Sequence, residues 1–367
     1  MSRTTPTLAS TTWLVAEREI MVRLRSKAFL ISTGILFAII LASILIGGFT
    51  SQNEPEATAV AVTTETEEIA AQNPSFDATV VDSVDAAKKL VTDGDVEAAI
   101  VPDSATDNPL GFKILGDDAA PTGVVNALSV SPPVDILNPA STDWFLLYIV
   151  SIAFGIVFMI SASTFGGVIA QSVVEEKQTR VVEILMSAVP VRALMAGKII
   201  GNSILAFCQI AVIAALSIIG LTVTGQGELL DAIGMPIVWF VIFFTIGFVL
   251  LAAMYAAAAS MVSRQEDVGS VTTPVMMLIM IPYVLVIMFN TNDLVMTIMS
   301  YVPFSAAVGM PVRLFAGTVE WWEPIVSLVI LVLSTLAMIA IGSRIYQGSL
   351  LRTSGRVKLK EALTAQK

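Results

Sequence analysis

Residues Ile233–Ser260 read IGMPIVWFVIFFTIGFVLLAAMYAAAAS, a run of 28 residues without a single charged side chain. About 20 apolar residues in a helix span the hydrocarbon core of a bilayer, because each residue adds about 1.5 Å. Five further segments meet this requirement: Ala28–Phe49, Trp144–Ile169, Leu194–Val223, Val271–Phe289 and Pro324–Arg344. The sequence therefore predicts an all-α polytopic membrane protein with six transmembrane helices.

The composition of the whole chain agrees with this prediction. Of the 367 residues, 55% are hydrophobic and 14% are charged, whereas a soluble domain has about 25% charged residues. Histidine is absent and Cys208 is the only cysteine, which excludes Ser-His-Asp triads, histidine-ligated metal sites and thiolate clusters. A net charge of −10 argues against nucleic acid as a partner. We therefore expect a protein that moves or anchors something, with no catalytic, cofactor or metal site of its own.

A seventh apolar stretch, residues 294–315, is interrupted by prolines and a glycine. Pro303, Gly309 and Pro311 break it, and Arg313 lies inside it. Interrupted helices are tolerated in lipid only under the cover of other protein segments. We therefore predict a re-entrant hairpin at residues 294–315, within a membrane domain that extends over residues 144–344.

The distribution of basic residues predicts the orientation. Sixteen of the 20 Lys and Arg residues fall on one side of the six spans, and the positive-inside rule places that side in the cytoplasm. Residues 1–27 and the basic tail 345–367 are then both cytoplasmic. The first span, residues 28–49, is longer than a signal-peptide core, so we expect an uncleaved anchor. The predicted location is the cell membrane, as in a bacterial plasma membrane.

Between the first two spans, residues 50–143 have a different character, with 17 acidic residues against three lysines. We expect Thr50–Pro74 to be a tether. Beyond it, the pattern predicts a small α/β extracytoplasmic domain with Gly94 closing its helix. The expected strands are Ala78–Val81, Ala98–Val101 and Phe112–Leu115, and the expected helix is Asp85–Val91, capped by Asp82 or Ser83.

The segment Gln171–Gly201, QSVVEEKQTRVVEILMSAVPVRALMAGKIIG, concentrates charge between two spans. On a helix, Glu176, Arg180 and Glu183 share one face, and Pro190 ends the run. We predict an amphipathic helix at 171–190 on the cytoplasmic membrane surface. Its candidate functional residues, which would face a partner, are Glu175, Glu176, Lys177, Arg180 and Glu183.

Three interpretations of this helix compete. It could be a solvated surface helix with a local salt bridge worth about 0.3–0.5 kcal/mol. Its Glu-Glu pair superficially matches the diglutamate motif of CAAX-type intramembrane proteases, but those enzymes also need histidines, which are absent. The third interpretation is a docking helix for a cytoplasmic protein.

The docking interpretation coincides with a family resemblance. The Glu175–Ser187 run and the Gly-Lys-x-x-Gly of Gly197–Gly201 resemble the hallmark of ABC-2 type permeases, specifically the sodium-efflux permease branch often called NatB-like. The charged start, Glu17–Glu19 and Arg23–Lys27, also resembles that family. The arrangement of one span, a large outer domain and five further spans is similar as well.

This resemblance implies the membrane subunit of an exporter that couples to a separate P-loop ATPase and works with a second permease, identical or related. It also implies that Glu176, Arg180 and Glu183 transmit the coupling. Independently, the chain contains no G-x-x-x-x-G-K-[S/T] phosphate loop, so ATP would have to be bound by the partner.

The spans contain almost no ionisable groups, which makes an ion-coupled secondary transporter less attractive. Lys198, near the cytoplasmic end of its span, is expected to snorkel to the interface. The alternative function is a membrane-anchored sensor or scaffold whose outer domain binds a ligand. Sodium, a drug, a peptide and a lipid all remain compatible as substrates.

Overall fold

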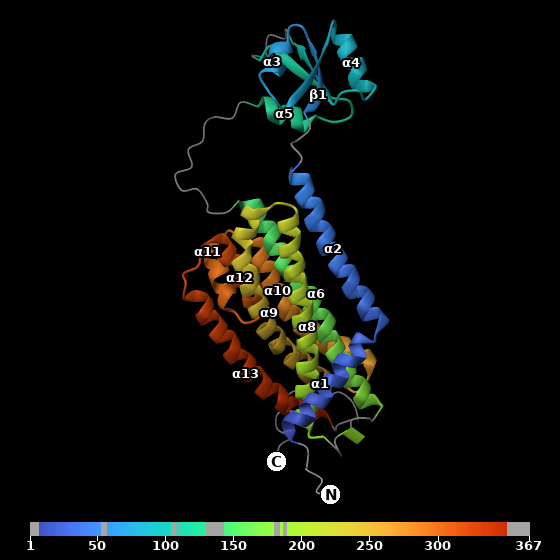
Figure 1. Cartoon of the computed structure of the whole chain (residues 1–367), viewed down its shortest axis with the longest axis vertical. Coiled ribbons are helices and arrows are strands. Elements are labelled where there is room, and N and C mark those ends of the chain that lie inside the picture. Colours follow the sequence, from blue (N-terminus) through green and yellow to red (C-terminus); the bar gives the residue numbers. More distant parts are fainter. Residues whose placement is uncertain are drawn as a thin grey trace. The chain divides into compact units, whose positions relative to one another are not determined.

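The computed structural model describes residues 7–52, 57–103, 108, 110–129, 143–179, 184–185 and 189–350. The chain divides into two compact units (Figure 1). One unit comprises Met1–Gly48 together with Ala140–Lys367, and the other comprises Phe49–Pro139. We describe each unit by itself.

The larger unit is a bundle of helices. Within the described residues, six helices are long and apolar enough to cross a membrane, which confirms the predicted number of spans. These are α2 (Lys27–Gln52), α6 (Trp144–Gln178), α8 (Val191–Val223), α9 (Gly227–Ser260), α10 (Val268–Met288) and α13 (Glu323–Leu350). The remaining elements are α1 (Leu8–Leu24), α11 (Asp293–Tyr301), α12 (Ala306–Ala316) and the 3-10 helix η1 (Gln265–Asp267).

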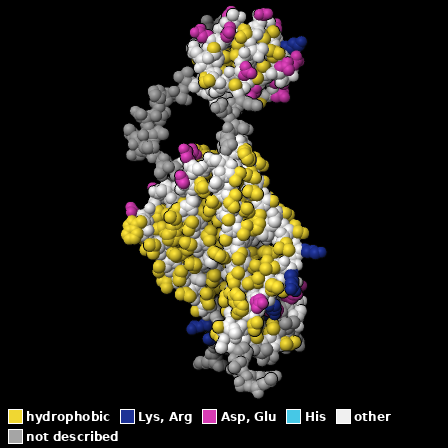
Figure 2. Space-filling model, viewed as in Figure 1, with side chains coloured by type: hydrophobic (Ala, Val, Ile, Leu, Met, Phe, Trp, Pro, Cys, Tyr) yellow, Lys and Arg dark blue, Asp and Glu magenta, His cyan; other side chains and the backbone are white. Residues whose placement is uncertain are grey.

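The surface of this unit fits a membrane protein. Hydrophobic side chains cover the middle of its visible face, and Lys and Arg lie mainly toward one end (Figure 2). Large apolar residues such as Ile35, Ile281 and Leu333 are more than half exposed. Such a surface is unfavourable in water but matches hydrocarbon.

Helix α9 forms the centre of the bundle and packs against α6, α8, α12 and α13. Its phenylalanines at four-residue intervals fall on one helix face, which meets a row of phenylalanines on α6. The ring centroids of the facing pairs are 4.6 Å apart for Phe154–Phe240, 5.7 Å for Phe158–Phe244 and 5.9 Å for Phe165–Phe248. Such aromatic pairs contribute about 0.5–1.5 kcal/mol each beyond the area they bury.

The stretch predicted as a hairpin forms the two short helices α11 and α12, with Pro303 between them. Most of α12 is buried, including Arg313, whose exposed fraction is 6%. Arg313 Nη1 donates to Glu323 Oε2 at 2.6 Å and to Ser300 Oγ at 2.9 Å, so the first residue of α13 neutralises this buried charge. Re-entry of the α11–α12 pair into the bilayer stays a prediction.

Several helix boundaries differ from the sequence prediction, among them the ends of α2 and α13. Helix α2 continues to Gln52, and α13 continues beyond Arg344 to Leu350. Helix periodicity gives no stop at either point, because polar residues such as Ser and Gln are compatible with a helix interior. The rest of the predicted tail, residues 351–367, lies outside the described residues.

The smaller unit contains a four-stranded sheet in the order β2-β1-β3-β4. β1 runs parallel to β2 and β3, and β4 pairs with β3 in the antiparallel direction. The strands are β1 (Thr58–Thr63), β2 (Phe76–Val81), β3 (Ala98–Pro102) and β4 (Phe112–Leu115), and the helices are α3 (Glu67–Ala71), α4 (Val84–Thr92) and α5 (Thr122–Leu128). Ser83 rather than Asp82 caps α4, because its side chain accepts a hydrogen bond from the Ala86 amide.

One prediction for this unit was wrong. Part of the expected tether, Thr58–Thr63, is β1, a central strand that pairs with both β2 and β3. Val60, Ala61 and Val62 are fully buried there, between helices on both faces of the sheet. The flanking Thr and Glu residues gave the stretch a tether-like composition, but TAVAVT is a short β-branched run typical of a buried strand.

The two opposite environments of β1 and β2 give a test of this topology. Ala61→Asp places a carboxylate in the sealed core, at a cost of several kcal/mol, which is comparable with the stability of a small domain. Ala78→Asp, on the exposed strand β2, is the matched control. We expect limited proteolysis of the detergent-solubilised full chain to cut residues 57–129 rapidly in Ala61→Asp only. Equal resistance of the two variants would contradict a buried β1.

Candidate functional site

Helix α1 lies directly on α8, and two glycines make this contact possible. A Cβ atom added to Gly197 would lie 2.5 Å from the Cβ of Val15, and one added to Gly201 would lie 2.8 Å from the Ala16 carbonyl oxygen. Small residues four positions apart let two helix backbones approach closely in a membrane. The Gly-Lys-x-x-Gly motif therefore has a steric role, because its two glycines form the surface on which α1 packs.

Between these glycines, Lys198 is completely buried and carries its charge into the junction. Its Nζ lies 3.0 Å from Glu19 Oε1 of α1 and 3.0 Å from Glu176 Oε2 of α6. It also donates a hydrogen bond to the Ser172 hydroxyl of α6. One ammonium group thus holds three helices together.

Arg18 completes the cluster from the rim of the junction. Its Nη2 lies 2.9 Å from Glu19 Oε1 and 2.5 Å from Glu176 Oε1. Two cations and two carboxylates alternate, so the group is neutral as a whole. We call these four residues (Arg18, Glu19, Glu176 and Lys198) the junction cluster.

The junction cluster favours the ionised form of Glu19. Burial alone would raise the pKa of Glu19, but the Lys198 ammonium and the Arg18 guanidinium outweigh it and hold that pKa below its ordinary value. A buried lysine with two carboxylate partners is tolerated, whereas removal of one partner leaves an uncompensated charge. The cluster therefore ties the positions of α1, α6 and α8 to one another.

Lys177, the next residue along α6, makes a second junction. It is buried, and its Nζ donates to the backbone carbonyls of Ser260 at 2.7 Å and Ser349 at 2.9 Å. These carbonyls lie at the last turns of α9 and α13, where helix dipoles favour a cation. Lys177 therefore binds the end of α6 to the ends of two further helices.

The predicted surface helix at 171–190 is not a separate element in its first half. Gln171–Gln178 is the end of α6, which runs without interruption from Trp144, and Val173 and Val174 are fully buried. These two valines of the amphipathic pattern therefore face the bundle rather than lipid. Arg180 and Glu183 lie outside the described residues, so the predicted face shared with Glu176 stays a prediction.

The structure separates the three described candidates by direction. Glu175 is exposed, Glu176 points to α1 and α8, and Lys177 points to α9 and α13. The expectation that Lys198 snorkels was wrong, because two carboxylates satisfy it inside the bundle. Arg18, Glu19, Ser172 and Lys198 were missed as site residues. The three charged ones had a signal in the sequence, Glu17–Glu19 and the Gly-Lys-x-x-Gly, but nothing in the sequence shows that these two motifs meet.

These motifs and spans lie within one family match. A family model described as ABC-2 family transporter protein matches residues 27–344, which is most of the chain. The chain belongs to the ABC-2 transporter family. The six apolar helices and this match together make it a multi-pass membrane protein of the permease type.

Two curated proteins are similar in sequence to this ABC-2 protein. "Uncharacterized protein YhaP" of Bacillus subtilis (strain 168) is 29% identical over 227 residues, covering 58% of this chain and 54% of that protein. "Uncharacterized protein MJ1024" of Methanocaldococcus jannaschii is 27% identical over 225 residues, covering 60% of this chain and 54% of that protein. The chain thus spans about half the length of the curated relatives it matches. No solved structure matches it significantly.

The close contact of α1 with Gly197 and Gly201 of the ABC-2 protein can be tested by a larger side chain at one of these glycines. Gly197→Val drives a side chain into Val15 and the Thr12 carbonyl, and such overpacking costs about 1–3 kcal/mol. We expect a lower thermal unfolding midpoint in detergent and faster proteolysis between α1 and α2. Gly167→Val on α6 is the control, since a Cβ atom there meets nothing within 4 Å. An unchanged midpoint for Gly197→Val would contradict the α1–α8 contact.

Neighbouring glutamates give a second test. Glu176→Gln leaves Lys198 with one carboxylate, and we expect a loss of up to about 3 kcal/mol, the low end of the range for breaking a buried pair. Glu175→Gln, on the exposed side, is expected to stay within about 0.5 kcal/mol of the parent. Thermal unfolding of both variants at neutral pH measures the difference. Equal effects would show that Glu176 is no more embedded than its neighbour.

Proposed function

We propose that this chain is the membrane-spanning permease of an ATP-driven ABC-2 exporter, and that the end of α6 transmits the motion of a separate P-loop ATPase. The observation that carries the proposal is that Glu175, Glu176 and Lys177 point in three different directions. Successive residues of a helix point about 100° apart. Glu175 therefore points away from the bundle, Glu176 points to the α1–α8 pair, and Lys177 points to the α9–α13 pair.

A force on this segment reaches most of the bundle. The junction cluster links α6 to α1 and α8, and Lys177 links α6 to α9 and α13. Because Lys198 and Lys177 are buried, their ion pairs and charge-assisted hydrogen bonds resist separation of the helices more than exposed pairs do. A shift of the end of α6 moves its four neighbours as well.

The proposed docking segment is the end of α6 and the chain that follows it up to Pro190. Glu175 is exposed on the last turns of α6, and the chain continues through Arg180 and Glu183 toward Pro190 at the start of α8. We propose that the partner ATPase contacts this segment and that Glu175 belongs to the contact surface. ATP is bound and hydrolysed by the partner, consistent with the missing phosphate loop in this chain.

We further propose that a second permease, identical or related, covers the face that includes α10. Met276, Met277 and Ile281 on α10 are 41%, 42% and 56% exposed. Helix α10 is held against α6 by the ring of Tyr283, which occupies the space beside Gly155. Movement of α6 would thereby reach the axis between the two permeases. Export, of sodium or of a small hydrophobic molecule, is the direction that the sodium-efflux resemblance favours.

The proposed arrangement also includes its sidedness. The junction cluster and both chain ends are cytoplasmic in this proposal, in accordance with the distribution of Lys and Arg. The acidic unit formed by Phe49–Pro139 is then extracytoplasmic. If that unit binds a ligand and no ATPase accompanies the chain, the sensor or scaffold function replaces the permease.

The first experiment is co-purification from native membranes in mild detergent, with every accompanying chain identified. We expect a stoichiometric P-loop ATPase. Its reproducible absence from an intact, folded preparation would favour the sensor or scaffold.

The second experiment tests transmission in vesicles that contain the co-purified complex. Glu176→Lys places a third cation beside Arg18 and Lys198, so ATP hydrolysis is expected to continue while ATP-driven sodium or hydrophobic-dye flux is lost. The charge swap Glu176→Lys with Lys198→Glu restores an opposite pair and is expected to recover part of the flux. Unchanged flux in Glu176→Lys, or no recovery in a folded double variant, would contradict the proposed role.

A further inference from the structure

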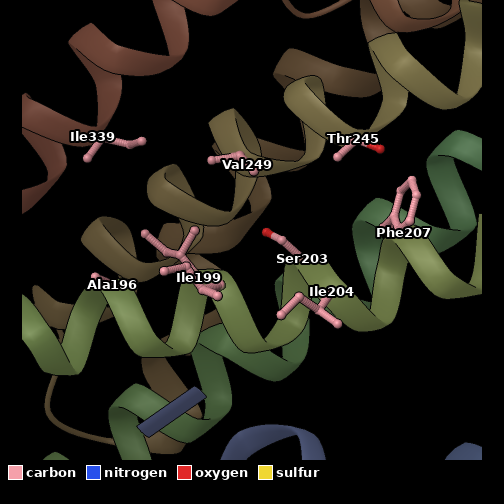
Figure 3. A pocket seen from close by; sticks show the side chains of 9 residues that line it. Ala196, Ile199, Ser203, Ile204, Phe207, Thr245, Val249 and Ile339 are labelled. Carbon is pink, nitrogen blue, oxygen red and sulfur yellow. The ribbon is translucent and has the colours of Figure 1, made fainter. Parts of the chain in front are cut away.

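An apolar groove opens on the bundle between α8 and α13, away from the junction cluster. It has a volume of about 460 Å³. Ala196, Ser203 and Phe207 mark its course along α8, Thr245 and Val249 line it from α9, and Ile339 lines it from α13 (Figure 3). None of its nine lining side chains is charged.

The dimensions of the groove match one leaflet of a bilayer. Its lining on α8 extends from Ala196 to Phe207, which at about 1.5 Å per residue corresponds to about 16 Å. Half of the hydrocarbon core is about 15 Å thick. Because the groove lies on spanning helices and is lined by aliphatic side chains, its natural occupant is a hydrocarbon chain aligned with the helices.

The α8–α13 crossing at one end of the groove carries charge. Met195 Cε of α8 packs beside Gly342 of α13, where an added Cβ atom would lie 3.2 Å from it. The two helices are therefore in contact at this end of the groove. Just beyond the contact, Arg192 on α8 is exposed. Arg192 lies four residues before Ala196, on the same helix face, and in the first turn of α8, where the helix dipole also favours a phosphate.

We propose that this groove binds one membrane phospholipid with an anionic headgroup. An acyl chain would lie against Ala196–Phe207, and the phosphate would lie beside Arg192. The inference rests on the membrane location of the chain and not on its coupling to an ATPase.

The experiment is native mass spectrometry of the full chain, purified in detergent and incubated with equal amounts of phosphatidylglycerol and phosphatidylcholine that carry the same acyl chains. We expect one retained lipid per chain, with phosphatidylglycerol preferred. Each arginine near a membrane surface contributes about 1 kcal/mol toward an anionic lipid, which is a preference of about fivefold. Arg192→Gln is expected to reduce the preference by that factor, and Arg264→Gln, on the exposed turn before η1, is the control.

Two variants fill the groove from different helices. Ser203→Phe on α8 and Ile339→Trp on α13 are each expected to lower lipid retention at least about tenfold. Ile219→Phe, on a half-exposed position of α8 outside the groove, is expected to leave retention unchanged. The thermal unfolding midpoint of each variant checks that the bundle is folded.

The outcomes separate the possible occupants. Loss of retention in both filling variants, together with a phosphatidylglycerol preference that Arg192→Gln weakens, supports the proposal. Full retention in a folded Ser203→Phe or Ile339→Trp variant would overturn it, as would equal retention of the two lipids by the parent. A change of oligomeric state in the filling variants without loss of lipid would assign the groove to a second copy of the chain instead. Failure of the co-purification experiment leaves this result unaffected.

Discussion

A single ammonium group, that of Lys198, sets the arrangement of one end of this protein. It is fully buried at a place where α1 and α8 come together through two glycines, so it cannot reach water. Burial of an unpaired charge would cost many kcal/mol, and the carboxylates of Glu19 and Glu176, with the Ser172 hydroxyl, offset that cost. The positions of α1 and α6 therefore follow from the need to supply these two groups. Arg18 balances the remaining charge.

The rest of the bundle is organised around α9. Its phenylalanine row against α6 is held by dispersion and area burial, which are non-directional and tolerate small adjustments. The links made by Glu176 and Lys177 are directional and depend on distance. A core of the first kind with a few contacts of the second kind at one end is suited to transmit movement, because helices can slide a little in the core while their ends stay tied.

The unit formed by Phe49–Pro139 follows a different principle. Its sheet is stabilised by buried small and β-branched residues of β1 and β3, with helices over both faces. Its acidic surface keeps it soluble, whereas the bundle depends on an apolar surface. The chain thus combines a unit with a surface suited to water and a bundle with a surface suited to lipid. The change of composition near residue 50 marks the transition between them.

The sequence by itself determined the six spans, the break at Pro303 and three of the four strands, because these depend on local composition and periodicity. It also located the charged segment at the end of α6 and the family. Only the tertiary structure decided that Glu176 faces Arg18 and Lys198 rather than water, and that Thr58–Thr63 is a central strand. The physical reason is the same in both cases. Burial and ion pairing depend on partners distant in the sequence, such as Glu19 for Lys198, and helical or strand periodicity carries no record of which segments meet.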